Sequence, residues 1–213
     1  MFFRFLFSLA LVTCTVSSPT ALTEVQRLAR FSPRDYVIDL LASEATSSQA
    51  GGSLSRMNLE TLPVSEGFGL AMTLIQLEPC GINLPHTHPR ASEAIYVIDG
   101  GNVTIGNVHE NGVNVVLNDM RIGQATIIPQ GAIHFEQNND CRPAVLLAAN
   151  NNEDPGTLTI ALRFFTLADG TLAASFGSDE RTMRMLREGI PIDGPAPGTK
   201  ECYRRCGLNY PAI

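Results

Sequence analysis

The chain has 213 residues, of which 44% are hydrophobic and 17% are charged, and this balance excludes both a disordered chain and a coiled coil. The length fits one domain with appendages. Fifteen basic residues against twenty-one acidic ones leave a net charge of −6, and no basic run occurs, so a nucleic-acid-binding surface is excluded.

The N-terminal segment 1–18 carries the one strongly apolar stretch of the sequence. Arg4 precedes an apolar run from Phe5 to Val12, and small residues follow as far as Ser18. This layout is typical of a secretory signal peptide, because the run is much shorter than the roughly 20 residues that span a bilayer. We therefore predict a secreted protein, extracellular or in the cell wall, with no membrane segment in the mature form.

Export would place the other four cysteines in an oxidising compartment. Their even number predicts two disulfides, and three connectivities are open among Cys80, Cys141, Cys202 and Cys206. The last two would share one face of a helix, where the geometry seldom suits a disulfide, so each is expected to reach back toward the rest of the fold. Segment 102–104 (Asn-Val-Thr) is a glycosylation sequon that an exported chain can use.

Residues 19–53 are predicted to form a short N-terminal arm. Segments 22–30 and 33–43 have the spacing of short helices, and 47–53 is a polar, glycine-containing connector. These pieces are too short to carry a core of their own, so we do not expect them to form a separate domain.

Residues 54–170 are predicted to form an all-β domain, because short β-rich segments alternate with turn residues. Hairpins are expected around 99–101 and 111–112, and a turn at 129–131. Eight such strands indicate a sandwich or a small barrel. The predicted strands are 69–77, 94–98, 102–105, 113–117, 125–128, 133–137, 144–148 and 158–165. The side chains expected in the barrel core are Met72, Leu74, Ile127, Ile128, Val145 and Leu147.

Residues 171–213 are predicted to form a C-terminal helical extension. Ser178 is expected to cap a helix that has acids in its first turn and ends at Gly189. A linker rich in proline and glycine, 190–200, then leads to a short helical turn with the last two cysteines.

Three of the four histidines lie in two compact motifs. His86 and His88 are two residues apart, so on an extended strand both side chains project to the same side. Glu93 follows on the next extended stretch, and His134 comes from a distant strand. Three neutral imidazoles and one carboxylate would fill four positions around a divalent cation, which suits manganese, iron, nickel, copper or zinc. His109, beside a turn, is predicted to be a structural or a surface residue with no role in the site.

The two motifs resemble the paired signatures of the cupins, and the run 83–93 (NLPHTHPRASE) resembles germins, germin-like proteins and the spherulin-like proteins of fungi and slime moulds. In this resemblance His86, His88, Glu93 and His134 fall on the metal ligands of the family. The resemblance implies an all-β cupin jelly-roll barrel that is secreted, is usually loaded with Mn2+, and assembles as a homo-oligomer.

The resemblance also implies a first functional hypothesis. Germins are oxalate oxidases and some germin-like proteins are reported as superoxide dismutases, so the chain would be an oxidoreductase for a small anionic ligand such as oxalate or superoxide. Asn83 falls on one of two asparagines of the germin oxalate site and is predicted as a catalytic residue that donates a hydrogen bond to the anion. The second asparagine aligns with Thr73, a departure from germins.

The second hypothesis is a non-catalytic extracellular metal-binding protein, associated with a cell wall or a spore coat. The departure at Thr73 and the added terminal elements favour it. The four protein ligands would leave two further coordination positions on the metal ion. The two hypotheses differ in whether these positions stay open to a small ligand or are covered by the arm or the C-terminal segment. A single motif set argues against oxalate decarboxylation, because the decarboxylases of this superfamily typically carry two cupin domains.

Overall fold

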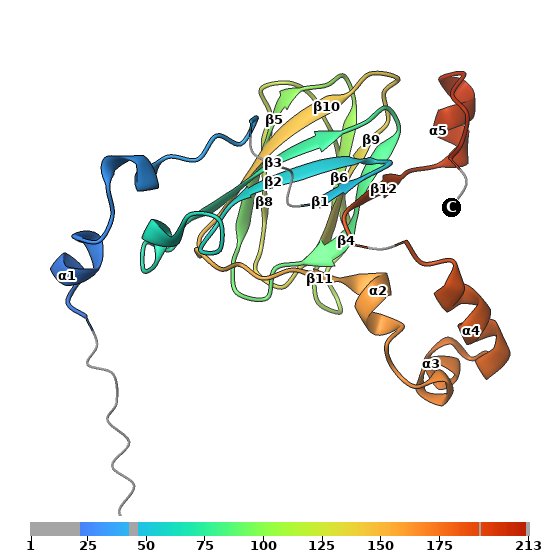
Figure 1. Cartoon of the computed structure of the whole chain (residues 1–213). Helices are drawn as coiled ribbons and strands as arrows, with labels where there is room; N and C mark the ends of the chain where they lie inside the picture. The colour runs from blue at the N-terminus through green and yellow to red at the C-terminus, as the bar shows by residue number, and fades with distance from the viewer. Residues whose placement is uncertain (1–21, 43–46, 192, 212–213) are drawn as a thin grey trace, which may run out of the picture.

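The computed structural model describes residues 22–42, 47–191 and 193–211, and the predicted signal peptide lies outside them. In these ranges the strands form two six-stranded antiparallel sheets that face each other as a barrel, with short helices at both ends of the chain (Figure 1). The predicted all-β jelly-roll class is therefore confirmed. No described helix reaches the length and apolarity needed to cross a bilayer.

Each strand is short, and turns and loops separate consecutive strands. The strands are β1 Ser47–Gln49, β2 Gly52–Met57, β3 Ala71–Leu77, β4 Gly81–Thr87, β5 Glu93–Asp99, β6 Val103–Val108, β7 Val116–Met120, β8 Ala125–Ile128, β9 Ile133–Asn138, β10 Ala144–Asn150, β11 Leu158–Thr159 and β12 Pro195–Pro197. The helices are α1 Glu24–Leu28, η1 Pro33–Tyr36, η2 Pro63–Ser65, α2 Ile160–Phe164, α3 Asp169–Phe176, α4 Glu180–Glu188 and α5 Lys200–Arg205. One sheet has the order β1-β2-β3-β10-β5-β8, and the other has the order β11-β4-β9-β6-β7 with β12 paired to β4.

The hydrophobic core fills the space between the two sheets. Ile128 and Leu74 are buried as predicted, but Ile127 is 68% exposed and the core strand β10 buries Leu146 rather than its neighbours. The run in β10 is apolar at every position from 144 to 149, so alternation in the sequence does not show which side faces inward. The core cluster contains Leu54, Ile75, Leu77, Ile95, Val97, Val103, Ile105, Met120, Ile128, Ala132, Ala144, Leu146 and Ala148.

Three predictions about single segments are wrong, and two predicted turns are confirmed. Segment 47–53 is not a free connector, because β1 and the start of β2 pair as a hairpin. Segment 99–101 does not close a hairpin, since β5 and β6 lie in different sheets. The predicted strand 158–165 ends after two residues and becomes α2, because β12 occupies the next part of the β4 edge. The hairpin around 111–112 and the turn at 129–131 are present.

The helices α2, α3 and α4 pack beside one end of the barrel (Figure 1). Leu172 and Met183 form a small buried cluster there, with Phe165 packed against it. The predicted helix ending at Gly189 is present as α4, but Asp179 rather than Ser178 is its cap, because the Asp179 carboxylate accepts from a backbone N–H in the first turn.

The C-terminal segment returns to the barrel and joins a sheet. β12 pairs antiparallel with residues 81–83 at the start of β4. The approach is close enough to require glycine: a Cβ on Gly51 would overlap the backbone of Ala196, and one on Gly81 would overlap the carbonyl of Gly51. The strand that leads into the His86 motif is therefore held between the N-terminal hairpin and the C-terminal segment.

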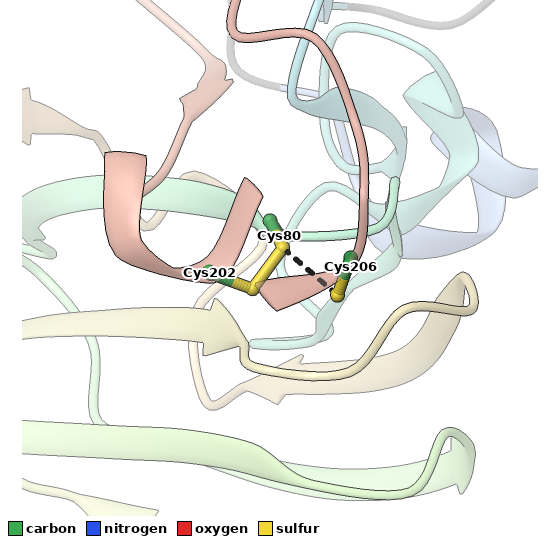
Figure 2. Close-up of side chains that lie close together, drawn as sticks. All are labelled: Cys80, Cys202 and Cys206. Atoms are coloured by element: carbon green, nitrogen blue, oxygen red, sulfur yellow. Dashed lines mark hydrogen bonds between the residues drawn. A yellow bond between two sulfur atoms is a disulfide. The ribbon is translucent and has the colours of Figure 1, made fainter. Parts of the chain in front are cut away.

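Two disulfides fix α5 to the barrel. Cys80 pairs with Cys202 and Cys141 pairs with Cys206, so both C-terminal cysteines reach back as expected. Figure 2 shows the bond from Cys80 to Cys202 and the nearby Cys206, whose sulfur lies 3.7 Å from that of Cys80. Cys80 and Cys202 are buried together with Tyr203. The structure thus selects one of the three connectivities that the sequence leaves open.

Removing either disulfide is expected to destabilise the fold strongly. The Cys80–Cys202 bond spans 122 residues and the Cys141–Cys206 bond spans 65. Loop-closure entropy then gives about 4 to 5 kcal/mol for each, with the longer loop contributing more. We expect urea denaturation of the two paired alanine variants to show losses of this size, larger for Cys80→Ala/Cys202→Ala. A loss below about 1 kcal/mol in both variants would contradict the pairing.

Candidate metal centre

Four polar side chains meet between the two sheets. His86 lies on β4, His88 directly follows that strand, and His134 lies on β9. β4 and β9 are neighbours, and their register places His86 opposite His134. Glu93 begins β5 in the other sheet and completes the cluster from across the barrel. All four predicted residues are therefore brought together.

The distances suit donors that share one ion. The ring centroids of His86 and His134 are 4.1 Å apart. The ring centroid of His88 lies 5.1 Å from that of His86 and 5.2 Å from that of His134. Nε2 of His134 is 2.9 Å from one oxygen of Glu93, and Nε2 of His88 is 3.4 Å from the other. One ring nitrogen from each histidine lies within 4.8 Å of the others, close enough for one cation to contact all three.

Backbone carbonyls fix the protonation of the three imidazole rings. The Nδ1 atom of each ring lies within hydrogen-bond distance of a carbonyl oxygen, and a carbonyl only accepts, so Nδ1 carries the proton. Each Nε2 then presents a lone pair to the cluster, which is the arrangement seen for metal-binding histidines. The partners are Leu84 for His86 at 2.8 Å, Gly156 for His88 at 2.6 Å and Ala132 for His134 at 3.0 Å.

Two buried atoms of the cluster face each other without a hydrogen bond. Oε2 of Glu93 and Nε2 of His134 are 2.9 Å apart, yet neither has a hydrogen-bond partner in the described structure. With the imidazole proton on Nδ1, neither atom carries a hydrogen, so two lone pairs point at each other. Buried lone pairs in this arrangement require a cation between or beside them, either a proton or a metal ion. The residues present therefore fit a divalent cation.

The side chains of the cluster shift one another's pKa values. Burial acts to lower the pKa of His134, but the hydrogen bond that a protonated Nε2 would donate to Glu93, together with the charge of nearby Glu136, outweighs burial and raises this pKa to about 9. Burial, together with the other two imidazoles, lowers the pKa of His86 to about 3. Burial acts to raise the pKa of Glu93, but hydrogen bonds from His134 and His88 hold it well below its usual range. Without a metal ion, the cluster thus holds a proton between His134 and an ionised Glu93, next to a neutral His86, and a divalent cation would take the place of that proton.

Glu136 is a further acidic group of the site that the sequence reasoning missed. It lies on β9 two residues after His134, so both side chains point inward, and it is fully buried. Asn83 Nδ2 donates to Oε2 of Glu136 at 2.8 Å, and the other carboxylate oxygen has no partner among the described residues. Burial raises the pKa of Glu136 to about 7. The sequence contained one signal for this role: Glu136 follows the predicted ligand His134 by two residues on a predicted strand, so both side chains should face the same side.

A small cavity of about 30 Å³ opens beside the cluster. At about 10–15 Å³ for each water-sized position, it has room for a ligand group of very few atoms. The predicted residues Asn83 and Thr73 both line it, while His109 lines a separate surface pocket. The cavity walls are Leu54, Arg56, Thr73, Ile75, Asn83, Leu84, His86, His88, Glu93, Thr157, Thr159, Asp193 and Gly194.

Comparison with known proteins places this barrel and site in a family. The sequence matches the Cupin family over residues 38–184. It is 41% identical over 188 residues to spherulin-1B of Physarum polycephalum, covering 87% of this chain and 75% of that protein. It is 34% identical over 160 residues to a probable germin-like protein, subfamily 2 member 5, of Arabidopsis thaliana, covering 74% of each.

Among solved structures, an oxalate oxidase matches with a TM-score of 0.63 and 23% identity, covering 71% of this chain and 81% of that one. This likeness supports the fold. The chain belongs to the cupin family, and within it to the group of the spherulins and germin-like proteins. The resemblance seen in the sequence motifs is therefore confirmed.

The contact between Asn83 and Glu136 can be tested by a double-mutant cycle. Asn83→Ala leaves both oxygens of a buried carboxylate without a partner, so the free energy of unfolding is expected to fall by about 1–3 kcal/mol. Asn83→Ala/Glu136→Ala is expected to lose less than the sum of the two single variants, by about 1 kcal/mol or more. Urea denaturation in the presence of a chelator measures this, and strictly additive losses would show that the two side chains are not paired.

Proposed function

We propose that the chain is a secreted germin-like cupin that holds one divalent metal ion through His86, His88, Glu93 and His134. The expected ion is manganese, and the expected activity is that of an oxidoreductase on a small anionic ligand such as oxalate or superoxide. The observation that carries the proposal is the set of three Nε2 lone pairs, fixed by carbonyl contacts at Nδ1, that converge with a buried carboxylate. Manganese accepts such mixed nitrogen and oxygen ligands.

When bound, the ion would supply Lewis-acid and electron-transfer chemistry. The residues of the chain hold and orient the reactants. The amide nitrogen of Asn83 donates one hydrogen to Glu136 and carries a second, which is the donor proposed for an anion in the cavity that Asn83 lines. The small cavity volume supports a ligand of few atoms and limits the entry of bulk water.

The alternative is a non-catalytic extracellular metal-binding protein associated with a wall or spore coat. One observation favours it: Asp193 and Gly194, from the C-terminal segment, form part of the cavity wall. This segment is fixed by β12 and by two disulfides, so it restricts access to the metal centre. A protein that only stores or binds a metal ion would benefit from such a cover, whereas an oxidoreductase needs a passage for its substrate.

Secretion, glycosylation and assembly stay predictions. The proposed signal peptide precedes the described residues, and Asn102 of the sequon is exposed in the turn after β5. N-terminal sequencing and the mass of the secreted chain before and after deglycosylation would test both. The homo-oligomer is proposed from the family resemblance. Exposed apolar side chains on the C-terminal helices, Phe176 and Met185 among them, offer a surface for it.

The metal centre is tested by the substitution His88→Ala, with His109→Ala as the matched control. His88 supplies one of the proposed ligands, whereas His109 lies in a separate pocket. We expect His88→Ala to lose most of the bound metal, by a factor of about 10 to 100 in affinity or more, while the barrel stays folded. Elemental analysis with circular dichroism measures this. Full metal retention by His88→Ala would contradict the proposed ligand set.

The activity is tested on the manganese-loaded wild-type protein. Hydrogen peroxide production that depends on oxalate, or removal of superoxide, is expected for the wild type and for His109→Ala, and its loss is expected for His88→Ala. If the loaded protein holds stoichiometric metal and is inactive in both assays, the oxidoreductase proposal fails and the binding protein becomes the supported function.

A further inference from the structure

Arg56 lines the metal-centre cavity and is half-buried. It is on β2, directly opposite Thr73 of β3, and two residues beyond the buried Leu54, which faces the core. Because side chains alternate along a strand, Leu54 and Arg56 point to the same side. The paired strands thus place Leu54 opposite Ile75 in the core, and the next pair on the same side is Arg56 opposite Thr73.

A second, larger cavity of about 230 Å³ adjoins the first. The two cavities have four wall residues in common: Arg56, Thr73, His88 and Thr157. His88 is a proposed metal ligand, so these four shared residues, here called the junction residues, connect the wall of the larger, outer cavity with the metal centre. Arg56 is the only one of these four junction residues with a permanent positive charge.

The guanidinium of Arg56 has no acidic partner among the residues that the structure describes. Within the described ranges no hydrogen bond or ion pair involves its side chain, although the residue is half-buried. The three acids of the two cavities are engaged elsewhere. Glu93 faces His134 in the metal centre, Asp154 pairs with Arg90 at 2.8 Å, and Asp193 accepts from the hydroxyl of Thr159. A half-buried arginine without an anionic partner is a binding position for an anion.

We propose that Arg56, with Thr73 beside it, forms a carboxylate-binding subsite at the passage between the two cavities and determines which ligands reach the metal centre. The proposal rests on the proposed function, since it adds a specificity-determining residue, Arg56, for the small carboxylate already proposed as ligand. The planar guanidinium fork matches the two oxygens of a carboxylate, and Thr73 offers a hydroxyl next to it. A carboxylate bound there reaches toward His88 from the outer cavity.

The test uses sodium oxalate as the probe and Arg56→Gln and Arg56→Lys as variants. Isothermal titration of the manganese-loaded proteins is expected to show oxalate binding about 10- to 100-fold weaker for Arg56→Gln, with an intermediate loss for Arg56→Lys, which keeps the charge without the fork. Manganese content is expected to be unchanged in both variants. Arg121→Gln, which removes an exposed arginine from the turn after β7, is the matched control and is expected to bind as the wild type does.

Two further measurements separate this subsite from the metal centre. Oxamide, the uncharged diamide with the shape of oxalate, is expected not to bind. In metal-free protein, NMR titration is expected to show weak oxalate binding that Arg56→Gln abolishes, so the subsite stays testable if the metal proposal fails. Oxalate binding by Arg56→Gln equal to that of the wild type, or no oxalate binding by the wild type with or without metal, would overturn the proposal.

Discussion

The metal centre depends on the register of β4 against β9. His86 and His134 stand opposite each other because these two strands pair antiparallel across the middle of one sheet. A slip of one residue would turn one imidazole to the outer face, because side chains alternate along a strand. Glu93 comes from the other sheet, so the four side chains meet only when the two sheets pack together. Folding of the barrel and assembly of the site are therefore one event.

The site could be predicted in part because its chemistry is local in the sequence. His86 and His88 are two residues apart, and His134 follows a proline- and glycine-containing turn. Arg56 and Glu136 could not be predicted in the same way. Arg56 acquires its position from the pairing of β2 with β3, and Glu136 from its contact with Asn83 on the neighbouring strand. The spacing of two residues from His134 places Glu136 on the inner face of the strand, but no sequence motif indicates its contact with Asn83 or the position of Arg56.

The fold shows the same division between local and long-range information. Turn residues predicted the loop between β6 and β7 correctly, because a hairpin is specified by a few adjacent residues. The apolar run of β10 did not reveal its inward side, and segment 47–53 looked like a free connector until its pairing with the sheet was known. The disulfide pairing likewise depends on how β12 returns to β4, a contact that no local pattern encodes.

The C-terminal segment connects stability with ligand access. The same disulfides that fix α5 hold the segment of Asp193 and Gly194 against the cavity. The most direct test of the metal centre is anomalous diffraction at the manganese edge from crystals of the loaded protein. We expect one peak about 2.0–2.3 Å from the three Nε2 atoms and from an oxygen of Glu93. A peak at another place, or at the ring Nδ1 atoms, would contradict the central claim.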